Sequence, residues 1–121
     1  MKHLSTWKNL APQLVRQRIL IEGTTKHIVD PELIKKYLLA LSTCVQMRPL
    51  QQPFSYPAEN MGYGGWIHWI TSGAHFYSYP TNPPLFTVDA YTCKPFDAEV
   101  AAEFTRDYLH AIEIVWKEIE V

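Results

Sequence analysis

Residues 65–79 read GWIHWITSGAHFYSY, two apolar and aromatic runs separated by a Ser72-Gly73 pair. The first run, 65–71, is apolar at both odd and even positions, which predicts a strand in the middle of a sheet with both faces covered. The second run, 75–79, has the aromatic character of a strand. Because a Ser-Gly pair between two such runs favours a turn, the stretch predicts an antiparallel hairpin. Whether Ser72 only turns the chain or also takes part in chemistry stays open at this point.

The stretch 85–93, LFTVDAYTC, predicts a further strand with two different faces. Alternation places an apolar set on the face suited to helix packing and a polar set with a thiol on the other: Phe86, Val88 and Ala90 against Thr87, Asp89, Tyr91 and Cys93. Residues 17–24 are rich in β-branched side chains around Gly23 and predict a strand as well. A weaker strand is expected at 51–56, limited by Pro53 and Pro57.

Two helices are expected beside these strands. Asp30 and Pro31 have the N-cap and first-turn signature of a helix that runs to about Met47. Asp97 caps a second helix, whose apolar and polar stripes continue to about residue 120. The predicted order, β-α-β-β-β-β-α, indicates an α+β two-layer sandwich, with an antiparallel sheet and two helices packed on one face.

Length and composition narrow the class of protein. The 121 residues predict a single domain over 1–121, in which 1–16 form an N-terminal arm. A net charge of −1 argues against a nucleic-acid or anionic-membrane surface. No apolar run approaches the roughly 20 residues that span a bilayer, and no signal-peptide pattern begins the chain. We therefore expect a cytoplasmic protein in which the thiols of Cys44 and Cys93 stay reduced.

Several kinds of site can be set aside. The glycines of GYGG at 62–65 precede a strand and have no lysine beside them, so they do not form a phosphate-binding loop. His68 and His75 lie seven residues apart without further soft ligands nearby, so no metal site is expected. What remains is Glu22 at a strand end, Ser72 at a turn and Cys93 at the end of a later strand. Each of these has an ordinary structural explanation when taken alone.

Taken together, these residues resemble a known family. TVDAYTC at 87–93, the Tyr79-Pro80 pair and EGTT at 22–25 are similar to segments of the S-adenosylmethionine decarboxylases, above all the small prokaryotic pyruvoyl-dependent form. The resemblance spans about residues 17–115. It implies that Ser72 attacks the carbonyl of Thr71, that the chain is cleaved between them, and that a pyruvoyl cofactor remains on residue 72. The implied activity is decarboxylation of S-adenosylmethionine for the synthesis of polyamines such as spermidine.

The resemblance also assigns roles to individual residues. Cys93 would return a proton to the substrate carbon after CO₂ leaves. Glu22 would face the cationic substrate, and Phe54 resembles an aromatic residue that contacts adenine. The family has a histidine for self-cleavage five residues after the serine, where this chain has Tyr77, while His75 lies three residues after it.

The same comparison leaves alternatives open. The family cleaves a Glu-Ser pair, whereas this chain has Thr71 before Ser72, and Thr25 stands where a second acidic group would be. One alternative is a non-processing homologue that binds a ligand or a partner subunit without catalysis. Another is a pyruvoyl-dependent decarboxylase of a basic amino acid such as arginine or ornithine. In each case the small size of the chain favours a homodimer.

Overall fold

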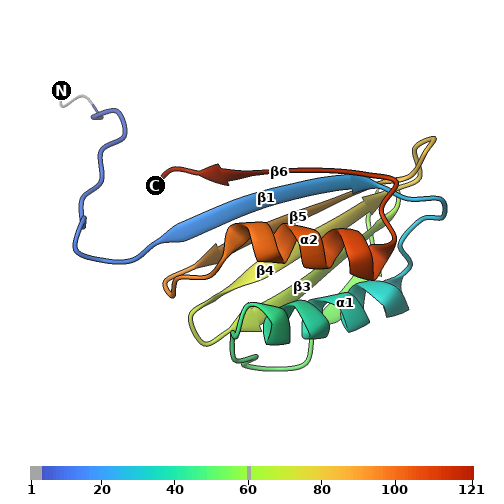
Figure 1. Ribbon diagram of the computed structural model, residues 1–121, viewed down its shortest axis with the longest axis horizontal. Helices are drawn as coiled ribbons and strands as arrows, with labels where there is room; N and C mark the ends of the chain where they lie inside the picture. The colour runs from blue at the N-terminus through green and yellow to red at the C-terminus, as the bar shows by residue number, and fades with distance from the viewer. Residues whose placement is uncertain (1–3, 60) are drawn as a thin grey trace.

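The computed structural model describes residues 4–59 and 61–121, which form one antiparallel sheet and two helices on the same face of it (Figure 1). The strands follow the spatial order β2-β3-β4-β5-β1-β6. The elements are β1 (Gln17–Thr24), α1 (Pro31–Cys44), β2 (Phe54–Pro57), β3 (Tyr63–Trp69), β4 (Ser72–Tyr79), β5 (Leu85–Thr92), α2 (Ala98–Leu109) and β6 (Glu113–Ile119). The predicted α+β sandwich is confirmed.

Local signals placed several element boundaries correctly, among them both ends of β1 and the starts of the two helices. The Asp30 side chain accepts a hydrogen bond from the Leu33 backbone N–H at 2.9 Å, as the predicted N-cap of α1 should. The helix ends at Cys44, three residues before the predicted end. Gln46 then adopts a left-handed φ of 59°, which cannot continue a right-handed helix.

The C-terminal segment was predicted wrongly. Instead of continuing to residue 120, α2 ends at Leu109, because His110 turns left-handed with φ 53°. The chain then forms β6, which pairs antiparallel with β1. The apolar positions of 112–119 also fit a strand, and pairing satisfies backbone groups along one edge of β1 that a helix would leave exposed. Tertiary hydrogen bonding therefore overrode the apparent helical stripe.

Two predictions about the hairpin were also wrong. Trp69 pairs with Ser72, so the turn consists of Ile70 and Thr71, and Ser72 is the first residue of β4. The sheet is covered on one face only, because no described element packs on the face opposite α1 and α2. On β3, Trp69 is therefore buried against the helices, while His68 is exposed on the other side.

The core lies between the sheet and the helices, on what we call the helix face. It is built from the alternate residues of each strand that point to α1 and α2, and these include Ile19, Ile21, Ile67, Trp69, Ala74, Phe76, Phe86, Val88 and Ala90. Two buried polar contacts fix the helices: the Tyr37 hydroxyl lies 2.6 Å from that of Thr105, and the Trp69 indole N–H donates to Ser42 Oγ at 2.7 Å. The other surface, the open face, carries the remaining alternate residues.

The N-terminal arm lies along the edge of this open face. Residues 4–16 contain no helix or strand. Figure 1 shows the arm turning back beside the C-terminal end of the chain. The Asn9 side-chain amide donates to the Val121 carbonyl at 3.5 Å, which ties the arm to that end.

Candidate active site

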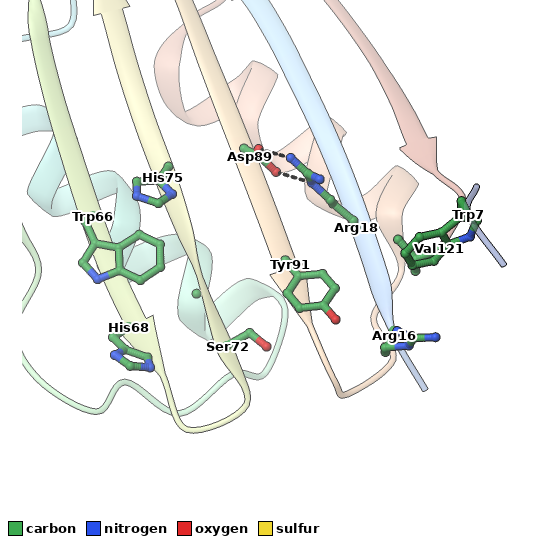
Figure 2. Close-up of a pocket in the computed structure, with 11 residues that line it drawn as sticks. Trp7, Arg16, Arg18, Trp66, His68, Ser72, His75, Asp89, Tyr91 and Val121 are labelled. Carbon is green, nitrogen blue, oxygen red and sulfur yellow. Dashed lines mark hydrogen bonds and ion pairs between the residues drawn. The ribbon is translucent and has the colours of Figure 1, made fainter. Parts of the chain in front are cut away.

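A pocket of about 600 Å³ opens on the open face, over β3, β4, β5 and β1. Figure 2 shows its side chains rising from these strands and from the arm. The lining residues are Trp7, Arg16, Arg18, Trp66, His68, Ser72, Gly73, His75, Asp89, Tyr91 and Val121. Its size suits a small-molecule ligand.

Ser72 lines this pocket, and the structure brings its hydroxyl together with the thiol of Cys93, which is not itself a lining residue. Ser72 Oγ lies 3.7 Å from Cys93 Sγ, although the two residues are 21 positions apart in the chain. The backbone N–H of Cys93 donates to the carbonyl oxygen of Thr71 at 3.0 Å. A donor on this oxygen stabilises negative charge there, which is what attack on the Thr71 carbonyl carbon requires.

The backbone at this point is strained. Ser72 has a φ of 150°, a conformation that residues with a side chain rarely adopt. The Thr71 side chain is also fixed by hydrogen bonds, because its hydroxyl lies 3.3 Å from Met47 Sδ and 3.4 Å from the Thr92 hydroxyl. The peptide bond between Thr71 and Ser72 is therefore fixed on both sides, with strain localised at the serine.

Gly73 is required by packing rather than by backbone freedom. A Cβ atom at this position would meet the Ile67 carbonyl oxygen at 2.6 Å and the Trp66 ring at 2.7 Å. The Trp66 indole thus occupies the space above Gly73 and forms the wall of the pocket beside Ser72. Its ring centroid also lies 4.1 Å from that of His75.

The two candidates for a processing residue occupy different places. His75 lines the pocket, and partial burial lowers the pKa of its imidazole, an effect that the charge of Asp89 partly offsets. Tyr77 does not line the pocket. It lies five residues along β4 from Ser72, about 17 Å at the rise of a strand. Its neighbour at that position is Tyr56. The pKa of Tyr56 is raised, first by burial and then by hydrogen bonding to Tyr77.

The two predicted substrate-binding residues do not line this pocket. Glu22 is on the open face of β1, where it borders a smaller depression with Leu20, Val115, Trp116 and Lys117. Phe54 is on β2 as the cross-strand partner of Trp66, and about half of its side chain is exposed. Phe54 therefore lies next to the aromatic wall, and Glu22 lies on the far side of the pocket.

The sequence interpretation missed several pocket residues. Arg18 donates two hydrogen bonds to Asp89, at 3.0 and 2.7 Å, and Figure 2 shows this pair on the floor of the pocket. Hydrogen bonding to Asp89, with its charge, raises the pKa of Arg18. The alternation of β5 did place Asp89 on the polar face, but its partner lies 71 residues away. No local pattern reveals such a pair.

The described residues offer neither a metal-binding cluster nor a membrane-spanning helix. Within 4–59 and 61–121, no group of three or more His, Cys, Asp or Glu side chains is arranged to hold a metal ion. Neither helix in that part of the chain is long and apolar enough to cross a membrane.

Comparisons with known proteins agree on one relationship. A sequence model of the S-adenosylmethionine decarboxylase family matches residues 20–120. The crystal structure of the adenosylmethionine decarboxylase from Aquifex aeolicus VF5 superposes with a TM-score of 0.72 and 22% sequence identity. The match covers 88% of this chain and 90% of that one. Among curated protein sequences, no significant match was found.

Proposed function

The chain belongs to the S-adenosylmethionine decarboxylase family, and from this premise we propose that it is a pyruvoyl-dependent decarboxylase of S-adenosylmethionine, self-processed between Thr71 and Ser72. The observation that carries the proposal is the grouping of the Cys93 thiol and the hydrogen-bonded Thr71 carbonyl around Ser72, whose side chain lines the pocket. Because the Thr71–Ser72 turn meets Cys93, which lies 21 residues after Ser72, an ordinary hairpin turn does not account for the arrangement.

Self-processing begins with the Ser72 hydroxyl. Its oxygen bonds to the Thr71 carbonyl carbon as the C–N bond to Ser72 breaks, and the hydroxyl proton passes to the freed amine. The Cys93 N–H stabilises the charge that develops on the carbonyl oxygen. Loss of the Ser72 Cα proton then expels the Thr71 carboxylate and cuts the chain. Water displaces the nitrogen as ammonia and leaves a pyruvoyl group on residue 72.

The surroundings of Ser72 fit such a group, because residue 72 borders the pocket and Gly73 leaves room for the Trp66 ring beside it. A pyruvoyl group on residue 72 would supply a ketone for the substrate amine and an electron sink for decarboxylation. The remaining tasks belong to side chains of this chain. The Cys93 thiol holds the proton that returns to the substrate carbon, and the face of Trp66 attracts the sulfonium charge.

The product would enter the synthesis of polyamines such as spermidine in the cytoplasm. A homodimer is also part of the proposal, and the exposed aromatic residues of the open face support it. Large aromatic side chains rarely gather on the free surface of a monomer, and Phe54, Tyr56 and Tyr91 remain about two-fifths to one-half exposed. Sedimentation at micromolar concentration should give twice the mass of 14.0 kDa. A monomeric mass would contradict the proposed dimer but would not bear on the proposed decarboxylase activity.

Denaturing electrophoresis with intact-mass measurement tests the main proposal. The purified chain should separate into fragments 1–71 and 72–121, the second beginning with a pyruvoyl group, and should release CO₂ from carboxyl-labelled S-adenosylmethionine. Ser72→Ala, as the control, should give one uncut chain without activity. One full-length band from the wild-type chain, together with no CO₂ release, would reject the proposal.

A second candidate is a homologue that binds a ligand without processing itself. The observation that favours it is Tyr77, which stands where the family has its processing histidine and lies outside the pocket. An uncut wild-type chain that S-adenosylmethionine or a polyamine still stabilises in a thermal-shift titration would support this candidate. Decarboxylation of arginine or ornithine is less favoured, because the acid of the pocket, Asp89, is already paired with Arg18. Measuring CO₂ release from both amino acids tests it.

A further inference from the structure

One wall of the pocket comes from the N-terminal arm, outside the residues that the family model matches. Trp7 and Arg16 line the pocket, whereas the match begins at residue 20. The Arg16 guanidinium lies over the Trp7 ring, with 6.0 Å from Cζ to the ring centroid, and its Nη2 donates to Asn9 Oδ1. Asn9 is in turn fixed, because its Oδ1 also accepts from the Ala11 N–H at 2.9 Å. The arm therefore holds this guanidinium in a defined position.

Arg16 has unused binding capacity. Its Nε is shielded from solvent and has no hydrogen-bond partner among the described residues. No ion pair of the described chain includes Arg16, whereas Arg18, the other arginine of the pocket, is paired with Asp89. A shielded N–H without an acceptor is costly unless a ligand supplies one. The guanidinium, with its rigid planar set of donors, is best matched by a carboxylate.

The strand register places Arg16 and the aromatic wall on opposite sides of Ser72. Ser72 pairs with Thr92 on β5, and Thr92 pairs with Gln17 on β1, so two strand spacings, about 10 Å, separate Ser72 from the residue next to Arg16. On the other side of Ser72 is β3, with Trp66. Figure 2 shows Arg16 and Ser72 on opposite sides of the Tyr91 ring.

We propose that Arg16 is a specificity residue that binds the α-carboxylate of an amino-acid ligand in this pocket. The inference rests on the proposed function for one point only, that the ligand amine sits at residue 72. With the amine there, the carboxylate extends towards Arg16 and the remainder of the ligand towards Trp66. The guanidinium then fixes the direction of the bond that breaks. Because Arg18 is neutralised by Asp89, Arg16 supplies the positive charge that balances the carboxylate.

Titration calorimetry on the full-length Ser72→Ala chain tests the subsite without cleavage or turnover. The probes are three matched pairs in which one member lacks the carboxylate: S-adenosylmethionine and its decarboxylated form, arginine and agmatine, ornithine and putrescine. For at least one pair, Arg16→Gln should weaken binding of the carboxylate-bearing member roughly ten- to a hundredfold, as loss of charged hydrogen bonds does. Binding of the member without the carboxylate should change less than about twofold.

Two further variants keep the test specific. Arg48→Gln removes an equal charge from an exposed position outside the pocket and should leave all affinities unchanged. Arg16→Lys keeps the charge but not the planar fork, and should recover part of the lost affinity. If Arg16→Gln weakens both members of every pair equally, or none, the subsite is rejected. If the effect appears only with arginine or ornithine, the subsite stands and S-adenosylmethionine as substrate falls.

Discussion

The two faces of the sheet are built from the same strands, yet they carry different kinds of residue. On β4, Ala74 and Phe76 are fully buried on the helix face, while His75 between them is exposed on the open face. On β5, Val88 is buried, and its neighbour Asp89 forms the ion pair on the pocket floor. One side of each strand therefore supplies apolar burial and the other supplies the site. Substitutions on the two faces should affect stability and activity separately.

The largest expected effect is on activity, from Cys93→Ala on the open face. Removing the thiol should lower CO₂ release roughly 10²- to 10⁴-fold, the usual contribution of a positioned proton donor. Cleavage at Ser72 should persist, because the backbone N–H of Cys93 remains bonded to the Thr71 carbonyl. Assays of CO₂ release and chain cleavage check this. Cys44→Ala, which removes a partly buried thiol outside the pocket, should change neither.

The matching test on the helix face is Phe76→Ala. Phe76 is fully buried and stacks on Phe86 at 5.7 Å between ring centroids, so its loss should lower the free energy of unfolding by about 3–5 kcal/mol. Urea denaturation measures this. The neighbouring open-face change, His75→Ala, should cost less, about 1–2 kcal/mol, because this exposed ring loses only its contacts with the rings of Trp66 and Tyr77. Equal costs for the two variants would contradict the division between the faces.

Gly73→Ala tests the packing of the Trp66 wall on the open face. The added Cβ would press on the Ile67 carbonyl oxygen at 2.6 Å and on the Trp66 ring. We expect a loss of about 1–3 kcal/mol in the free energy of unfolding, as for overpacked sites, together with slower cleavage. In the control, Gly64→Ala, the nearest atoms belong to the Tyr56 ring on the edge strand, which has room to move. A tolerated Gly73→Ala with normal cleavage would show that the Trp66 wall is not needed.

The smallest effect concerns pH and His75. Burial lowers the pKa of this histidine in the folded protein, so below about pH 6.5 the unfolded chain binds more protons than the folded one. Stability should therefore fall as the pH drops below about 6.5. Melting temperatures between pH 7.5 and 5 should fall less steeply for His75→Gln than for the wild type. If melting temperature fell equally with pH in the two proteins, His75 would have the same pKa in the folded and unfolded states, which would contradict the prediction.

Local patterns predicted the elements that carry strong local signals. The Asp30-Pro31 start of α1 and the alternation of β5 were read correctly, because caps and period-two burial depend on residues close together in the chain. The C-terminal strand was missed, because its partner, β1, lies almost 100 residues earlier. At the site, the grouping of Ser72 with Cys93 came from the family resemblance. Neither the local patterns nor the family resemblance indicated the Arg18–Asp89 pair or the place of Arg16 in the pocket lining.

By itself, the sequence determined the α+β class, the polar face of β5 and the family, since composition, periodicity and motif are properties of the linear chain. Only the tertiary structure decided which residues share the pocket. Strand order and register set the 3.7 Å approach of Ser72 to Cys93 and leave Glu22 outside the pocket. The physical reason is that alternation fixes which face a side chain takes, whereas its neighbours on that face depend on hydrogen bonding between strands distant in the sequence.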